Sequence, residues 1–265
     1  MNRKTRKKDK SDFRKKITEQ IDKKRIITVV ILGIMILLIG AGIREGFYLI
    51  TDMSQENDEK YPVKGIDVSK HQGEIDWEGI AEQGFEFAYI KATEGTTHVD
   101  SRFEYNWKNA RKHVFRVGAY HFLSYDSPGD TQAANFMKTV PRRWNTLPPV
   151  VDVEFYGDYR KRGQHPSKEK MYTILDVILE KLENGYGKKP VIYTNKFIYQ
   201  TYISGRYDDY DIWISDHSIP DSLSDGRMWT FCQYTFTGKS KYVSNGNKSF
   251  DADIFYGSKY KLRHY

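Results

Sequence analysis

The sequence has almost no cysteine and lacks the common nucleotide-binding and zinc-binding motifs. Cys232 is the only cysteine among 265 residues, so a folded domain must be stabilised by its core without an internal disulfide. There is no GxxxxGK[ST] or GxGxxG loop, and no pair of histidines has HxxxH spacing. Cys232 lies in a strand-like run without a nearby histidine motif, so we expect a packed thiol rather than a nucleophile.

The part of the sequence expected to fold has no excess of basic residues, although the formal net charge of the chain is +7. Residues 1–25 contain 12 Lys/Arg and 4 Asp/Glu, which leaves 30 basic and 31 acidic side chains for the other 240 residues. The excess charge therefore belongs to an amino-terminal tail, and we expect no nucleic-acid partner for the folded part.

One long apolar run follows the basic tail. The 18 residues Ile26–Ile43 contain no charged side chain, and a helix of that length nearly crosses a hydrocarbon core. We predict a basic cytoplasmic tail over 1–25 and a transmembrane signal anchor over 26–46. The positive-inside rule then predicts a single-pass protein of the cell membrane whose later residues are extracellular. The alternatives are a buried core helix and a signal peptide cleaved near Gly40-Ala41-Gly42.

After a polar linker over 47–62, residues 63–265 alternate short apolar runs with amphipathic stretches. One stretch repeats apolar residues from Met171 to Leu182 at helical spacing, with Ser167 expected to cap its start and Gly185 to end it. Asp130 is expected to begin another helix. This alternation predicts an α/β fold with a parallel sheet, either closed as a barrel or open. The expected strands are 64–69, 85–92, 116–123, 148–155, 189–195, 211–216 and 228–235.

Two acids interrupt the apolar run "PVVDVEF", and other polar side chains occur near the carboxyl ends of the other expected strands. Side chains i and i+2 share one face of a strand, so Asp152 and Glu154 should project together. Two close carboxyl groups do not ionise equally easily, which would leave a proton donor beside an acceptor. The alternatives are a structural acid pair satisfied by basic or backbone donors, and a metal site completed by His71 or His121.

The motifs together resemble those of the family 25 glycoside hydrolases, the lysozymes that cut peptidoglycan. The resemblance runs from about Val63 to Gly257 and implies an irregular TIM-like (β/α) barrel without a cofactor or metal. It also implies cleavage of the β-1,4 bond between N-acetylmuramic acid and N-acetylglucosamine, with peptidoglycan glycan strands as the partner. The motifs are "GIDVSKHQGEIDW", "FAYIKATEGTTHVD", "GAYHFL", "PPVVDVEF", "PVIYTN", "DIWISD" and "WTFCQYTFTGK…SFDADIFYG".

The resemblance also implies roles for individual residues. Glu154 matches the general acid/base, and Asp152 matches its partner, either a nucleophile or a carboxylate that orients the substrate acetamide. Asp67 and Asp251 match two further acids of the same cleft. Asp253 stands where the family usually has asparagine, and we expect it to add charge to the rim or to be hydrated.

Four further residues at the expected barrel mouth are predicted to line the sugar subsites by stacking and hydrogen bonding. Two rival functions stay open. One is a peptidoglycan-binding module without turnover, and the other is a metal-dependent carbohydrate deacetylase. Two further departures from the family pattern, His98 and Ser215, leave the subsite preferences open. The four predicted subsite residues are Tyr120, Tyr193, Trp213 and Gln233.

Overall fold

A computed structural model of the chain describes residues 32, 35–36, 38–40 and 59–265. The predicted tail over 1–25, most of the anchor over 26–46 and most of the linker over 47–62 lie outside these residues. No helix within the described part is long and apolar enough to cross a membrane. Residues Tyr61–Tyr265 form one compact unit, and the buried ring of Tyr61 packs 5.3 Å from that of Trp229.

Eight strands of this unit close into a ring, because β1 pairs with β2 at one end of the strand order and with β9 at the other. The order around the ring is β1-β9-β8-β7-β6-β5-β4-β2, and the short β3 (His98–Val99) pairs with β2 outside it. The structure thus has a strand in each of the seven predicted ranges. The bounds are β1 (Lys64–Val68), β2 (Phe85–Glu94), β4 (Arg116–Phe122), β5 (Val150–Val153), β6 (Val191–Asn195), β7 (Asp211–Ser215), β8 (Phe231–Lys239) and β9 (Ser249–Phe255).

The prediction of a parallel sheet is wrong for the last part of the ring. Pairings from β1 through β2, β4, β5, β6 and β7 to β8 are parallel, but β9 runs antiparallel to both β8 and β1. Residues 240–248, which join β8 to β9, include no crossover helix, and a short connection between neighbouring strands favours antiparallel pairing. The result is a mixed barrel in which β9 carries Asp251 and Asp253.

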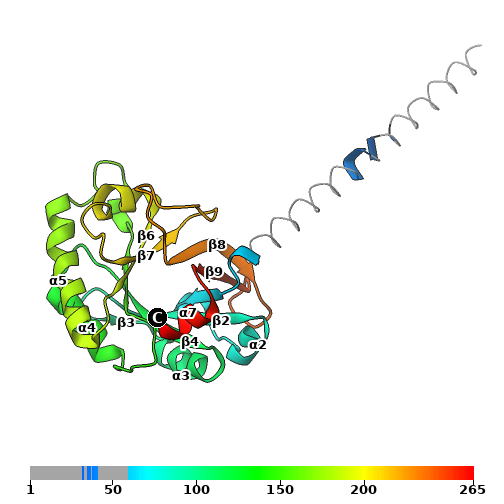
Figure 1. Cartoon of the computed structure of the whole chain (residues 1–265), viewed down its shortest axis with the longest axis horizontal. Coiled ribbons are helices and arrows are strands. Elements are labelled where there is room, and N and C mark those ends of the chain that lie inside the picture. The colour runs from blue at the N-terminus through cyan, green and yellow to red at the C-terminus, as the bar shows by residue number, and fades with distance from the viewer. Residues whose placement is uncertain (1–31, 33–34, 37, 41–58) are drawn as a thin grey trace, which may run out of the picture. The chain divides into compact units, whose positions relative to one another are not determined.

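Helices cover the outside of the ring, with α4 and α5 side by side in Figure 1. The hydroxyl group of Ser167 accepts the backbone N–H of Lys170, which confirms the predicted start of α5. The predicted end at Gly185 is wrong, because α5 continues to Tyr186 and Gly187 takes the left-handed conformation at φ 66°. The bounds are α2 (Trp77–Glu82), α3 (Phe103–His113), α4 (Gly129–Thr139), α5 (Lys168–Tyr186), α6 (Lys196–Ile198) and α7 (Lys259–His264).

The helix predicted to begin at Asp130 begins one residue earlier, at Gly129. Short turns complete the outer layer: two 3₁₀ turns, η1 (Lys70–Gln72) and η2 (Gly157–Arg160), and the π-helical turn η3 (Tyr199–Ile203). These turns belong to the connections between strands and do not add a further layer.

Alternation along each strand separates two apolar clusters. On β5, Val151 and Val153 join the cluster between sheet and helices, whereas Val150 joins the cluster inside the ring. Asp152 follows Val150 by two residues and therefore shares the inner face. Cys232 is a buried free thiol in the outer cluster, as expected for a packed side chain.

Gly129 of α4 lies against the backbone of α5, and we predict that Gly129→Ala destabilises the domain. An added Cβ would lie 2.3 Å from the carbonyl oxygen of Ile174, which belongs to the backbone of α5. Overpacking against rigid backbone costs about 1–3 kcal/mol in the free energy of unfolding. Urea denaturation measures the change, and Gly246→Ala is the control because a Cβ there meets nothing within 4 Å. Equal stability of the two variants would contradict this packing.

Candidate active site

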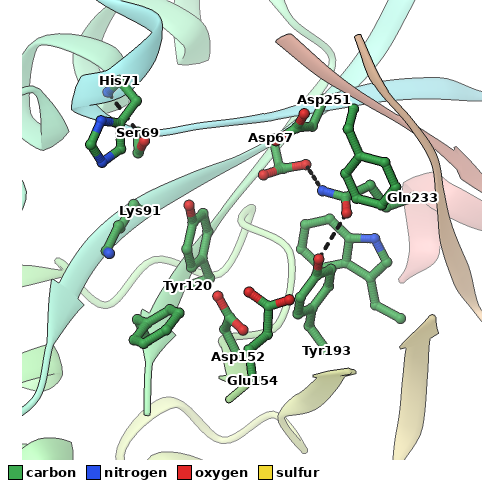
Figure 2. Close-up of a pocket in the computed structure, with 13 residues that line it drawn as sticks. Asp67, Ser69, His71, Lys91, Tyr120, Asp152, Glu154, Tyr193, Gln233 and Asp251 are labelled. Carbon is green, nitrogen blue, oxygen red and sulfur yellow. Dashed lines mark hydrogen bonds between the residues drawn. The ribbon is translucent and has the colours of Figure 1, made fainter. Parts of the chain in front are cut away.

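A cavity of about 320 Å³ opens at the carboxyl ends of the strands, and all eight predicted site residues line it (Figure 2). They come from β1, β4, β5, β6, β7, β8 and β9, together with the residue that follows β5. The structure therefore brings the predicted residues together, while their chemical roles stay predictions. The residues are Asp67, Tyr120, Asp152, Glu154, Tyr193, Trp213, Gln233 and Asp251.

Asp152 and Glu154 project side by side into this cavity (Figure 2). Asp152 is buried, and its Oδ1 atom has no hydrogen-bond partner among the described residues. Burial and then the charge of Glu154 raise the pKa of Asp152 well above its usual value. Burial also raises the pKa of Glu154, against the opposing effects of Arg160 and Lys91. Among the described residues neither carboxyl group forms an ion pair with a basic side chain, which argues against a structural acid pair held by basic partners.

A hydrogen-bonded chain crosses the floor of the cavity from β6 to β1. The hydroxyl groups of Tyr193 and Ser215 donate to Oε1 of Gln233 at 2.8 and 3.2 Å. The amide of Gln233 then donates to Oδ2 of Asp67 at 2.6 Å, as the dashed lines in Figure 2 partly show. Because Oε1 already accepts two hydroxyl groups, the amide of Gln233 is fixed with its nitrogen toward Asp67.

The two acids of β9 differ in their surroundings. Asp251 lines the cavity, and burial raises its pKa to about 6. Asp253 is fully buried, and its Oδ1 accepts the indole N–H of Trp213 at 2.9 Å. The expectation that Asp253 adds charge to the rim or is hydrated is therefore wrong. Asp253 lies on the inner face of β9 between Asp251 and Phe255, which places it below the mouth of the barrel.

Trp213 lies deeper than a typical sugar-stacking side chain. Only 2% of its surface is exposed, and its ring lies 4.9 Å from that of Tyr89 and 4.8 Å from that of Tyr193. It thus forms the floor of the cavity and holds Asp253. Because the sequence contains 20 Tyr and 5 Trp, it does not reveal which of these side chains form the floor of the cavity and which form its wall.

Lys91 also lines the cavity, although it was not among the predicted site residues. Its Nζ atom lies 2.7 Å from Oε2 of Glu94 and 4.7 Å from the ring centre of Phe122. Its charge lowers the pKa of both Asp152 and Glu154. The strand alternation that places Lys91 on the inner face of β2 is the sequence signal that could have identified it as a cavity residue.

Of the two histidines considered for a metal site, His71 lines the cavity with the acids, whereas His121 does not. His121 is buried, and its two ring nitrogens lie 2.7 Å from Thr93 Oγ1 and 3.0 Å from Gln132 Oε1. Burial lowers the pKa of His121 to about 4, so it is a neutral structural residue. Within residues 59–265 and the few described before them, no three His, Cys, Asp or Glu side chains form a metal-binding group.

Comparison with known proteins assigns this barrel and its acid-lined cavity to a family. The model of the glycosyl hydrolases family 25 matches residues 66–243. The chain belongs to this family. The resemblance inferred from the motifs is confirmed, and the protein is a member of a glycoside hydrolase (lysozyme) family with an irregular TIM-like barrel.

Relatives in bacteria cover most of the domain. The chain is 34% identical over 208 residues to the uncharacterized protein YegX of Escherichia coli O157:H7, covering 77% of this chain and 73% of that protein. It is 32% identical over 209 residues to Lysozyme M1 of Streptomyces globisporus, covering 76% of this chain and 70% of the relative.

Solved structures support the same fold. A family 25 glycosyl hydrolase from Bacillus anthracis aligns with a TM-score of 0.72 and 45% identity, over 77% of this chain and 94% of that one. A bacterial lysozyme from Streptomyces coelicolor aligns with a TM-score of 0.66 and 33% identity, over 76% of this chain and 94% of that one.

We predict that Lys91→Met raises the pKa of Asp152 and of Glu154, because a nearby cation that favours both carboxylates is removed. Carboxyl ¹³C NMR titration of the full-length protein measures the change. Lys259→Met is the control, since Lys259 pairs with Glu86 on the surface. Unchanged titration of both cavity acids in the Lys91 variant would show that Lys91 does not act on them.

Proposed function

We propose that the protein is a muramidase that hydrolyses the β-1,4 bond between N-acetylmuramic acid and N-acetylglucosamine in peptidoglycan. The observation that supports this most is the pair of buried Asp152 and half-buried Glu154, which line one open cavity and both have raised pKa values. Such a pair supplies both a proton donor and a carboxylate at one pH. Related proteins named Lysozyme M1 and Autolytic lysozyme support the substrate class.

In the proposed mechanism, the Asp152–Glu154 pair holds one proton and acts as a unit. Glu154 donates that proton to the glycosidic oxygen as the bond to the anomeric carbon breaks. Positive charge grows on the muramyl ring, and the carboxylate of Asp152 stabilises it directly, as a nucleophile, or by orienting the substrate acetamide. Glu154 then takes a proton from the attacking water, and the anomeric configuration is retained.

The remaining cavity residues support binding in this proposal. Asp67 and Asp251 add negative charge beside the muramyl ring, where the transition state is positive. Tyr120, Tyr193 and Gln233 line the sugar subsites with hydroxyl and amide groups, and Trp213 forms their floor. The residues before 47 place the enzyme in the cell membrane through the segment 26–46, with the catalytic domain outside.

We predict that Glu154→Gln lowers the rate of peptidoglycan hydrolysis by at least about 100-fold, because general acid catalysis contributes about 10²–10⁴. The fold should persist, since glutamine has nearly the same shape. Release of soluble fragments from purified peptidoglycan gives the rate. Glu180→Gln, on the exposed side of α5, is the matched control and should keep the parent rate. Parent-like hydrolysis by the Glu154 variant would overturn its assignment as the general acid.

The new reducing end separates a muramidase from other activities at the same barrel. We expect N-acetylmuramic acid at the reducing end of the fragments, identified by reduction and mass analysis. Binding without any new reducing end would support the non-catalytic wall-binding module instead.

We also predict that a chelator leaves the rate unchanged, because carboxyl groups alone supply the proton donor and acceptor in this mechanism. The rate of peptidoglycan hydrolysis is measured before and after dialysis against EDTA. A loss of activity that added Zn²⁺ restores would favour metal-dependent chemistry such as that of a deacetylase.

A further inference from the structure

Asp253 is an acid enclosed inside the barrel with too few donors for a negative charge. It is fully buried, and Trp213 donates to its Oδ1, but Oδ2 has no partner within the described part of the chain when the group is treated as ionised. A buried carboxylate normally accepts hydrogen bonds at both oxygens or is paired with a cation. The lone Oδ2 atom therefore needs a proton of its own or a donor.

The groups facing Asp253 make ionisation harder still. Asp67 lies diagonally across from it on β1, and Asp251 lies two residues before it on β9. Tyr89 on β2 and Cys232 on β8 are near enough to interact with its charge. Gln233 on β8 lies opposite Asp253, but its amide nitrogen points to Asp67. Burial, followed by the charges of Asp67 and Asp251, raises the pKa of Asp253 well above its usual value.

Asp67 is the diagonal neighbour of Asp253 across the pairing of β1 with β9, in which Asp67 lies opposite Asp251 and Gly65 opposite Asp253, so the two side chains share the inner face of the barrel. Two neighbouring carboxylates repel each other and both lack a hydrogen, so a hydrogen bond between them requires that one of them is protonated. Asp67 already accepts the amide of Gln233 at 2.6 Å and lies at the cavity, whereas Asp253 is sealed beneath it. The solvent-facing member with the additional donor is the better place for the charge.

We propose that Asp253 carries a proton in the folded protein and donates it in a hydrogen bond to Asp67, so that Asp253 positions Asp67 and favours its ionised form. Asp67 then has two donors, the amide of Gln233 and the acid group of Asp253. An asparagine at this position would serve the same purpose, because a neutral acid and an amide both donate a hydrogen bond. Any effect of this hydrogen bond on catalysis rests on the proposed function, whereas the protonation of Asp253 does not.

The first test is the pH dependence of stability in full-length protein, with wild type compared to Asp253→Asn. In the unfolded chain Asp253 is ionised above about pH 4, whereas the folded protein keeps the proton. Wild type therefore loses stability as the pH rises between these two pKa values, and the asparagine variant lacks this loss. The ratio of the two unfolding constants should change by about tenfold per pH unit from about pH 5 upward, in favour of the variant.

Asp158→Asn is the matched control, because it removes a carboxylate that is 79% exposed and bound to Lys161 on the surface. Its ratio to wild type should show no such rise with pH. A constant ratio for Asp253→Asn between about pH 5 and pH 8 would show that Asp253 is ionised in the folded protein and would overturn the proposal. This experiment uses no substrate, so it is independent of the muramidase assignment.

A second measurement uses only wild-type protein, so it does not depend on the folding of a variant. In wild-type protein labelled with ¹³C at the aspartate carboxyl groups, the carboxyl in contact with the indole N–H of Trp213 should remain protonated at neutral pH. An ionised carboxyl at that contact would overturn the proposal.

Activity then separates a positioning role from a purely structural one. Asp253→Leu removes the donor, and Asp253→Asn restores it, so the asparagine variant should exceed the leucine variant in kcat/KM by about tenfold or more. Equal kcat/KM values, with both proteins folded, would mean that the hydrogen bond to Asp67 has no effect on catalysis.

Discussion

The cost of removing carboxyl groups from water governs both the barrel mouth and its interior. Asp67, Asp152 and Asp253 are all buried, and burial is the main cause of the raised pKa of each. Apolar side chains such as Phe231 and Phe255 fill the ring below them and keep water out. The acids therefore influence one another strongly, since their charges act through protein rather than through solvent. A shallow cleft with the same acids would let each of them ionise separately.

Strand alternation is the link between sequence and site. The pattern Val150-Val151-Asp152-Val153 puts one pair of side chains against the helices and the other inside the ring. A simple period of two thus allowed the face of Asp152 and Glu154 to be predicted without coordinates. The same reasoning located each of the other parallel strands, because their apolar runs are short and bounded by turn residues.

Features that depend on distant contacts could not be predicted in this way. The antiparallel course of β9 is decided by its pairing with β1 and β8, which no local pattern reveals. Gly185 and Gly187 look alike in sequence, but Met137 of α4 packs over Gly185 while Gly187 adopts the left-handed turn. Whether an acidic side chain is hydrated or buried likewise depends on the residues packed around it. The burial of Asp253 next to Trp213 could therefore be seen only in the structure.

The position of β9 in the sequence has a consequence for the order in which the barrel is assembled. The strand β9 (Ser249–Phe255) follows the other seven strands of the ring in the chain, and it supplies Asp251, Asp253 and the closure between β8 and β1. Until β9 emerges, the nascent chain has two unpaired strand edges and an incomplete set of acids. The barrel and its acid-lined cavity are consequently completed late in synthesis, when β9 pairs with β1 and β8.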